Sequence, residues 1–388
     1  MQRRRLALTV LGLALSVEGA SAADAGSWAA ASASPRPIAG TLDPLESAAL
    51  AACGEGDAGL RETAGVLLAR KLRGLPLPEV DSIAAAQRAA GEPHPWPRAW
   101  AVSGRTLDRD AALPRLAPWL DAHRSTGVRR CGVALGASAD GTRTLVVVTV
   151  DALADLAPLP TRARAGQWLT VEARMRVPAR GGSVLLLGPS GAPRVVPSWF
   201  DGTTLRARFA PDRPGELTVQ VVADVATGPR PVVEATVFAD VEPGERADGA
   251  PAAAPGEDVA AGAADDDRLA AMITAARASV GLRPLVRDAR LDAVARAHAR
   301  RMAAAGELAH DAGDGDPFER LRAAGLDPAE AGENVAHSAT LAGAHRALWA
   351  SPSHRANLLR QAFDHVGVAV VRDDRGDAWV VEAFAGGR

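Results

Sequence analysis

Residues 332–359, GENVAHSATLAGAHRALWASPSHRANLL, lie in a part of the chain that is unusually rich in histidine. The chain has 388 residues and eight histidines, and six of these follow position 297. They are His298, His310, His337, His345, His354 and His365. Because histidine is the commonest metal ligand and a frequent acid–base group, we expect a functional site in the last third of the chain.

The residues on both sides of this stretch predict four helices and a hairpin. Apolar side chains recur at helical spacing in 265–280, 287–307 and 341–349. Asp316, Pro317 and Glu319 fit the N-cap, first-turn proline and capping-box acid of a short fourth helix. The chain finishes with HVGVAVV and AWVVEAFA around the turn RDDRGD, which predicts two antiparallel strands.

Several spaced motifs occur in this region in a fixed order: AHARRM, LAH, DGDPFERLRAAG, GENVA, WASPSHRANLL, GVAVV and WVVEAF. In that order they resemble the bacterial branch of the CAP superfamily, the cysteine-rich secretory protein, antigen 5 and pathogenesis-related 1 group. The resemblance covers residues 265–388, and it implies an α-β-α sandwich. It also implies a cleft with two histidines and acidic residues, which in some members bind a divalent metal.

The resemblance assigns cleft roles to His310 of LAH, Glu333 of GENVA and His354 of SPSHR. We expect Glu333 to enter from a loop, and His354 to lie in a helix that Ser351 caps. Two neutral imidazoles and a carboxylate would form an open three-ligand set for zinc. The alternative is a hydrogen-bonded network that only fixes the cleft. Ser351 stands where many eukaryotic members have a second glutamate, so the four-residue set is incomplete.

The remaining residues near the cleft are assigned smaller roles. His298 shares a helical stripe with Leu291 and Met302, so we expect a satisfied core or cleft-lining imidazole rather than a ligand. Asn334 and Ser351 are further candidates for lining the cleft. His345 borders the apolar stripe of its helix, and His337 and His365 are expected at the surface.

The N-terminus predicts export. Three arginines, an apolar run and the triplet Ala20, Ser21 and Ala22 form a cleavable secretory signal over residues 1–22. The apolar run is shorter than the roughly 20 residues that span a bilayer, so we expect a secreted or periplasmic protein without a membrane span. In such a compartment Cys53 and Cys131 are expected to form a disulfide, with two buried thiols as the alternative.

The rest of the chain predicts an α+β multidomain protein. Residues 23–158 form an α/β unit, and residues 159–241 alternate like short antiparallel strands and resemble an immunoglobulin-like β-sandwich. Residues 242–264 are Pro-, Gly- and Ala-rich and predict a linker to the CAP domain at 265–388. With 44 basic and 46 acidic residues, the chain lacks the charge of a nucleic-acid binder.

Parts of the N-terminal unit echo the last domain in order. RAAG occurs at 88–91 and 322–325, WLDAHR echoes WASPSHR, and CGVAL echoes VGVAV. The echoes suggest a degenerate CAP-like copy in which Leu67 stands opposite His298. The alternative is chance, because the chain is rich in Ala and Arg.

These observations favour a non-catalytic extracytoplasmic binding module whose cleft takes a divalent metal or a lipid, peptide or glycan. The first alternative is a metal-dependent hydrolase that uses the same residues, with Glu333 as ligand or general base. The second is an adhesion or scaffold protein with an idle cleft. The sequence has no cysteine after 131 and no recognisable serine nucleophile motif, which argues against catalysis.

Overall fold

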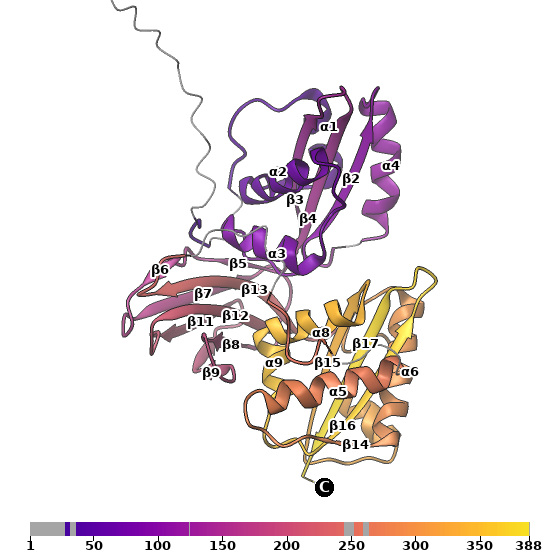
Figure 1. Cartoon of the computed structure of the whole chain (residues 1–388). Coiled ribbons are helices and arrows are strands. Elements are labelled where there is room, and N and C mark those ends of the chain that lie inside the picture. The colour runs from indigo at the N-terminus through magenta and orange to yellow at the C-terminus, as the bar shows by residue number, and fades with distance from the viewer. Residues whose placement is uncertain (1–27, 32–35, 124, 244–251, 259–263, 388) are drawn as a thin grey trace, which may run out of the picture.

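The computed structural model describes residues 28–31, 36–123, 125–243, 252–258 and 264–387, and the expected signal at 1–22 lies outside them. Within these ranges the chain forms three packed units, as Figure 1 shows. The N-terminal and C-terminal units each combine helices with a four-stranded sheet, and the middle unit is made of strands. The mixed α/β class predicted from the sequence is confirmed. In the described residues, no helix is long and apolar enough to cross a membrane.

The N-terminal unit is a sheet with helices on both faces. Its helices are α1 (Pro44–Cys53), α2 (Ala58–Leu72), α3 (Val80–Ala89) and α4 (Arg109–Asp121). Its strands are β1 (Glu55–Gly56), β2 (Arg98–Gly104), β3 (Val128–Ala137) and β4 (Arg143–Ala152), in the order β1-β3-β4-β2. Because side chains alternate along β4, Leu145 and Val147 pack toward α1 and α4, whereas Val146 and Val148 pack toward α2 and α3.

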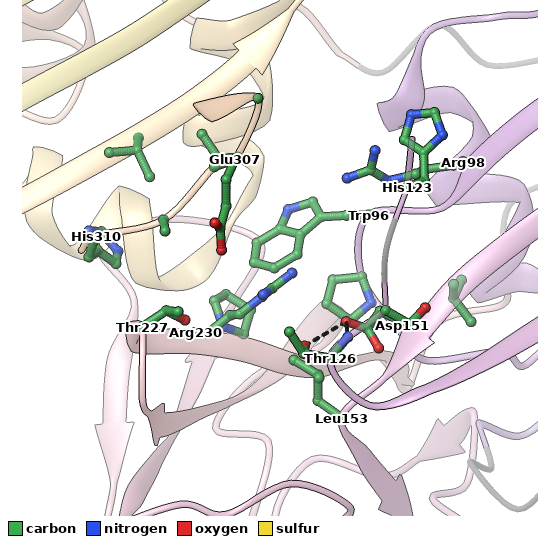
Figure 2. A pocket seen from close by; sticks show the side chains of 18 of the residues that line it. Trp96, Arg98, His123, Thr126, Asp151, Leu153, Thr227, Arg230, Glu307 and His310 are labelled. Carbon is green, nitrogen blue, oxygen red and sulfur yellow. Dashed lines mark hydrogen bonds between the residues drawn. The ribbon is translucent and has the colours of Figure 1, made fainter. Parts of the chain in front are cut away.

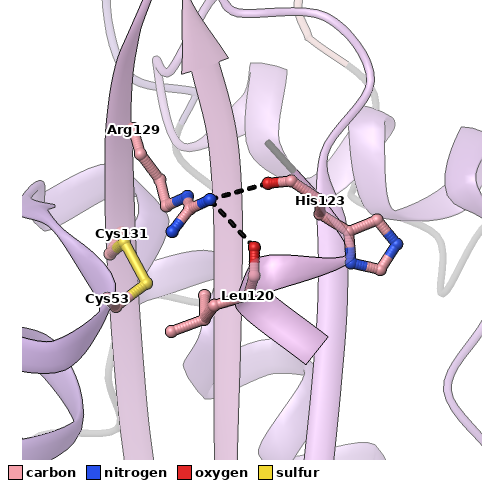
Figure 3. Close-up of a disulfide and its surroundings, with 5 residues drawn as sticks. All are labelled: Cys53, Leu120, His123, Arg129 and Cys131. Atoms are coloured by element: carbon pink, nitrogen blue, oxygen red, sulfur yellow. Dashed lines mark hydrogen bonds between the residues drawn. A yellow bond between two sulfur atoms is a disulfide. The ribbon is translucent and has the colours of Figure 1, made fainter. Parts of the chain in front are cut away.

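A disulfide joins the last residue of α1 to the middle of β3, as the sequence predicts. The Cα atoms of Cys53 and Cys131 are 6.2 Å apart, and both side chains are buried. Figure 3 shows that Arg129, two residues earlier on β3, donates hydrogen bonds to the carbonyl oxygens of Leu120 and His123 at 3.0 and 2.7 Å. Both helices on this face of the sheet, α1 and α4, are thus tied to β3.

The middle unit consists of two sheets that share one hydrophobic core. The first, in the order β10-β11-β7-β5, contains β5 (Ala154–Leu156), β7 (Leu169–Met175), β10 (Ser198–Phe200) and β11 (Thr204–Phe209). The second, in the order β6-β13-β12-β8-β9, contains β6 (Arg162–Ala163), β8 (Gly182–Leu187), β9 (Arg194–Val196), β12 (Gly215–Val225) and β13 (Gly228–Ala239). Since β5 pairs with β7, residues 154–156 join this unit, although the sequence assigned them to the N-terminal one.

The C-terminal unit is a second sheet with helices on both faces. Its helices are α5 (Asp265–Ala278), α6 (Ala289–Ala305), α7 (Pro317–Ala323), α8 (Leu341–Ala350) and α9 (Pro352–Leu358). Its strands are β14 (Val286–Arg287), β15 (Glu330–Ser338), β16 (His365–Arg372) and β17 (Ala378–Gly386), in the order β14-β16-β17-β15. Helices α5, α8 and α9 share a core with one face of the sheet, and α6 with the other.

The two outer units have the same sheet topology. In both, a two-residue strand pairs in parallel with the third strand, and the other pairings are antiparallel. Asp57 is the N-cap of α2, and its backbone N–H donates a hydrogen bond to the carbonyl oxygen of Cys131 at 2.9 Å. Asp288 is the N-cap of α6, and its backbone N–H donates in the same way to the carbonyl oxygen of Val366 at 3.0 Å. The residue that follows each acceptor is a glycine, Gly132 or Gly367, and the two glycines make equivalent contacts.

Gly132 and Gly367 allow a helix to lie directly on the sheet. A Cβ atom on Gly132 would lie 2.0 Å from the carbonyl carbon of Leu60, and one on Gly367 would lie 2.2 Å from that of Leu291. Both distances are far below van der Waals contact, so only glycine permits this approach. If Leu60 and Leu291 are equivalent, Leu67 and His298 are equivalent too, since each lies seven residues further along its helix.

The units contact one another through polar side chains as well as through packing. Helix α3 packs on β13, and α9 packs on β12 and β8. Arg346 on α8 lies 3.7 Å from Asp81 of the N-terminal unit and forms an ion pair with Glu257. Glu257 belongs to residues 252–258, the described part of the predicted linker, in which Ala254 is buried. This part of the linker is therefore docked against the C-terminal unit.

Candidate functional site

Glu333 lies at the centre of the candidate site. Its Oε1 is 2.9 Å from Nδ1 of His310, and its Oε2 accepts a hydrogen bond from Arg320. The side chain is buried, with a residue exposure of 6%. The expectation of a loop was wrong: Glu333 belongs to β15, opposite Ala383 of β17. Pairing with the neighbouring strand fixes its backbone more firmly than a loop would.

Arg320 is a site residue that the sequence analysis missed. It follows the capping box that Asp316 begins at the start of α7, and its side chain is buried. Besides Glu333, its guanidinium donates to the carbonyl oxygens of His310, at 2.7 Å, and Gly315. Arg320 thus holds both the cleft carboxylate and the backbone of the cleft histidine.

The pKa of Glu333 is lowered by its neighbours. Burial alone would raise this pKa, but the hydrogen bond and charge of His310 outweigh it, with further contributions from Arg320 and His298. Glu333 is therefore a paired carboxylate at neutral pH. A general base would need its pKa shifted upward, toward neutrality.

His298 is fully buried on α6, and both of its ring nitrogens have partners. Its Nδ1 lies 2.8 Å from a carboxylate oxygen of Asp314, and its Nε2 lies 3.0 Å from the carbonyl oxygen of Ala309. Nε2 is also 3.7 Å from Oε1 of Glu333. Since both nitrogens face acceptors, neither directs a lone pair toward a metal. This geometry agrees with a satisfied imidazole behind the cleft.

His310 lies in the segment that follows α6, which ends at the left-handed residue Gly306. Within the described residues, its Nδ1 contacts Glu333 and its Nε2 has no hydrogen bond. A Cβ atom on Gly228, the first residue of β13, would lie 3.0 Å from Cβ of His310. The middle unit therefore packs directly against the cleft histidine.

His354 lies on α9, and its residue exposure is 9%. Its carbonyl oxygen accepts a hydrogen bond from Nδ2 of Asn334 at 3.0 Å. Its Nδ1 is buried and has no hydrogen-bond partner among the described residues. Burial, together with the charge of His310, lowers the pKa of His354 to about 3. The ring is therefore neutral at physiological pH, as a metal ligand must be.

The cap of α9 comes from another unit. Ser351 occupies the N-cap position of α9, as the sequence predicts, but its side chain makes no capping bond. Instead, Gln220 of β12 accepts a hydrogen bond from the backbone N–H of Ser353 at 2.9 Å and donates one to Oγ of Ser351 at 3.0 Å. Gln220 thus positions the helix that carries His354.

Asn334 connects the cleft to a second buried acid. Its Nδ2 donates to Glu382 at 2.9 Å, and its Oδ1 accepts from Asn357 at 3.0 Å. Asn357 also donates to the carbonyl oxygen of Glu333 at 3.1 Å. Glu382 is fully buried on β17, and the sequence analysis missed it, although a glutamate inside the apolar run WVVEAF was a visible signal.

Glu382 predicts a distinctive dependence of stability on pH. Burial raises its pKa from 4.5 to about 7, despite the hydrogen bond from Asn334. Between these values the folded chain keeps a proton that the unfolded chain has lost, so this group destabilises the fold as pH rises. We expect the free energy of unfolding of Glu382→Gln, minus that of wild type, to rise by about 3 kcal/mol as the pH rises through this interval. Urea unfolding below pH 4.5 and above pH 7 measures the difference. A pH-independent difference would contradict the prediction.

The two cleft histidines line a cavity that all three units enclose. Its volume is about 590 Å³, and His310 and His354 lie on the wall that the C-terminal unit forms. Figure 2 shows His310 and Glu307 facing Trp96, Arg98 and Asp151 of the N-terminal unit and Arg230 of the middle unit. Glu333 is not among the lining residues, because His310 lies between it and the cavity. The cleft is therefore one wall of a larger interdomain space.

The predicted three-ligand set is not preassembled. In the described parts of the chain, one group of three residues places all its potential ligand atoms within 4.8 Å of one another: His337 of β15 with Asp373 and Asp377 of the adjacent β16–β17 turn. His337 also stacks on Trp379, with 4.1 Å between ring centroids. Both oxygens of Glu333 are already engaged in the cleft, which leaves the two histidines as the available donors there.

The last two histidines have local roles. His345 is fully buried, and its Nε2 lies 3.0 Å from the carbonyl oxygen of Pro255 in the docked linker segment. His365 is paired with Asp364 next to it at 2.6 Å. Neither lines the cavity.

Residues 270–384 match the family model described as CAP, the cysteine-rich secretory protein family. The C-terminal unit of this chain is a CAP domain, as its motifs predicted. No curated protein matches the chain.

Three solved structures resemble the chain. An outer surface protein from Borrelia burgdorferi is 22% identical, with 32% of this chain and 93% of that chain covered and a TM-score of 0.31. An extracellular protein containing a SCP domain from Bacillus anthracis is 15% identical, with 61% and 86% covered and a TM-score of 0.29. A cysteine-rich secretory protein from Staphylococcus aureus is 14% identical, with 61% and 84% covered and a TM-score of 0.28.

Proposed function

We propose that this chain is an exported binding protein whose CAP cleft and two further units together enclose a ligand. The observation that carries the proposal is the cavity of about 590 Å³, which lies in the size range of small-molecule sites and is lined by residues of all three units. The disulfide between Cys53 and Cys131 supports an oxidising compartment, either the periplasm or the outside of the cell. The ligand would be a lipid, peptide or glycan met there.

The proposal assigns a supporting role to the first two units. We infer that the N-terminal unit is a degenerate CAP-like copy, because it shares its sheet topology and its close helix approach at Gly132 with the C-terminal unit. Leu67 at the position of His298 leaves this copy without a cleft imidazole. The middle unit would be an immunoglobulin-like spacer that contributes Gln220 and Arg230 to the junction.

A divalent metal such as zinc is better matched by His310 and His354 alone than by the predicted set of His310, Glu333 and His354. Nε2 of His310 and Nδ1 of His354 have no hydrogen-bond partner in the described chain, and burial keeps the His354 ring neutral. Glu333, bonded to Nδ1 of His310, would orient that ring in the manner of the carboxylates behind zinc-bound histidines. The metal, when bound, would polarise an oxygen atom of the ligand.

Zinc titration of the purified protein by calorimetry tests this assignment. We expect one site, and we expect His310→Ala or His354→Ala to reduce its affinity at least about tenfold. His365→Ala is the matched control, because this histidine is paired with Asp364 away from the cavity, and it should bind like wild type.

His337→Ala distinguishes the cleft from the β16–β17 turn. We expect it to leave the affinity unchanged. If it abolishes binding while His310→Ala does not, the ion is held with Asp373 and Asp377, and the cleft assignment is wrong. Absence of any zinc binding would also reject a metal in the cleft.

A further inference from the structure

Two arginines from different units face the cavity without an ionic partner. Arg98 begins β2 in the N-terminal unit, and Arg230 lies near the start of β13 in the middle unit. Both line the cavity, as Figure 2 shows. Within the part of the chain that the structure describes, neither guanidinium makes a hydrogen bond or an ion pair, although Arg230 lies 5.0 Å from the ring centroid of Trp96. Guanidinium groups facing a cavity are typical binders of planar oxyanions.

The two guanidinium groups lie close enough for the charge of one to act on the pKa of the other. Burial lowers the pKa of both Arg98 and Arg230, and the charge of Arg230 lowers that of Arg98 further. The charges of Asp151 and Glu307 act in the opposite direction and raise the pKa of Arg230. Arg98 is exposed and Arg230 is partly exposed, so both positive charges are accessible to an anion that enters the cavity.

Trp96 is held at the cavity by a strained backbone. Its φ is 58°, in the left-handed region that bulky residues rarely adopt, and it stands between Pro95 and Pro97. The residue remains 36% exposed and lines the cavity. Strained residues of this kind persist where the surrounding structure requires them, and they concentrate at binding sites. Trp96 supplies a flat apolar wall beside the two arginines.

The acids around the cavity restrict the charge of the ligand. Asp151 is engaged, because it accepts hydrogen bonds from the backbone N–H and hydroxyl of Thr126 and from the N–H of Gly127, at 2.8 to 2.9 Å. Glu307 is exposed on the opposite wall and, among the described residues, its carboxylate has no hydrogen bond or ion pair. It would repel a polyanion and accept hydrogen bonds from an N–H or ammonium group. The polar walls also disfavour a long apolar tail.

We propose that the cavity binds a short peptide through its free terminal carboxylate, which Arg98 and Arg230 hold, while the peptide chain passes Trp96 toward Glu307 and His310. The inference rests on the proposed binding function and names the ligand class for the same cavity. The carboxylate provides the single negative charge that the arginine pair requires. The peptide N–H groups provide the donors that Glu307 requires.

The test compares N-acetyl-trialanine as the free acid and as the C-terminal amide, titrated into the full exported chain and followed by ligand-detected NMR. We expect the acid to bind at least about tenfold more tightly than the amide, since charge-assisted hydrogen bonds are lost in the amide. Arg98→Gln and Arg230→Gln should each weaken acid binding by about tenfold. Arg208→Gln is the matched control, because Arg208 lies over Trp168 on the outside of the middle unit.

The proposal would be overturned by equal binding of acid and amide, by acid binding that neither cavity variant weakens, or by no binding of the acid up to about 10 mM. If glucuronate binds more tightly than the tripeptide acid, the ligand is an acidic sugar, and the proposal of a peptide ligand is wrong. The acid–amide comparison uses the wild type alone, so a variant that fails to fold leaves it intact. It also uses no metal, so failure of zinc binding in the cleft and failure of carboxylate recognition are separate outcomes.

Discussion

Replacing Arg320 by methionine is expected to lower the free energy of unfolding of the C-terminal unit by about 3–5 kcal/mol. The substitution removes the guanidinium beside Glu333, whose side chain is buried, and leaves Oε2 of this carboxylate without its hydrogen-bond donor. It also removes the donor that holds the carbonyl oxygens of His310 and Gly315. Urea unfolding of the full chain, followed by hydrogen exchange of peptides from β15 and β17, measures the loss in this unit.

Arg322→Met is the matched control on the same helix. Its side chain is 65% exposed, and its nearest carboxylate, that of Asp327, is 3.8 Å away and also exposed. A surface pair of this kind contributes no more than about 1 kcal/mol. The double variant Arg320→Met with Glu333→Gln should recover part of the loss, because the buried charge is then absent. Equal effects of the two single arginine variants would show that Arg320 does not compensate Glu333.

The helices of the CAP domain could be predicted closely because their signals are local. Asp316 and Pro317 start α7 as the capping pattern requires, and Gly306 ends α6 in the left-handed conformation. Glu333 was misplaced in a loop because GENVA contains glycine and asparagine, which are typical of turns. The pairing with β17, which is remote in sequence, determines its conformation instead.

The parts of the site that sequence could not predict depend on distant contacts. Arg320 is one arginine among many, in a chain whose basic residues include a single lysine, so nothing in its immediate neighbours distinguishes it. Gln220 caps α9 across 133 residues of sequence, and Gly228 of the middle unit lies against His310 of the C-terminal unit. Local patterns predict the elements, whereas the cavity results from how the units pack on each other.

Removing the disulfide is expected to destabilise the N-terminal unit selectively. Cys53 and Cys131 close a loop with a sequence separation of 78, and the chain-entropy model assigns such a loop a stabilisation of about 4 kcal/mol. We expect Cys53→Ala with Cys131→Ala to accelerate hydrogen exchange of β3 and β4 by about a thousandfold. Reduction of the wild-type protein should have the same effect without creating a cavity, and it serves as the control for lost side-chain packing.

Strands β16 and β17 provide the internal reference for this experiment. They have the topology of β3 and β4 but no disulfide, so their exchange should not change if the outer units unfold independently. Equal acceleration in both units would mean that the junction around Arg346 and Gln220 couples them into one cooperative structure. Unchanged exchange of β3 and β4 would mean instead that the helix contacts of the N-terminal unit, including those of Arg129 with Leu120 and His123, are sufficient without the bridge.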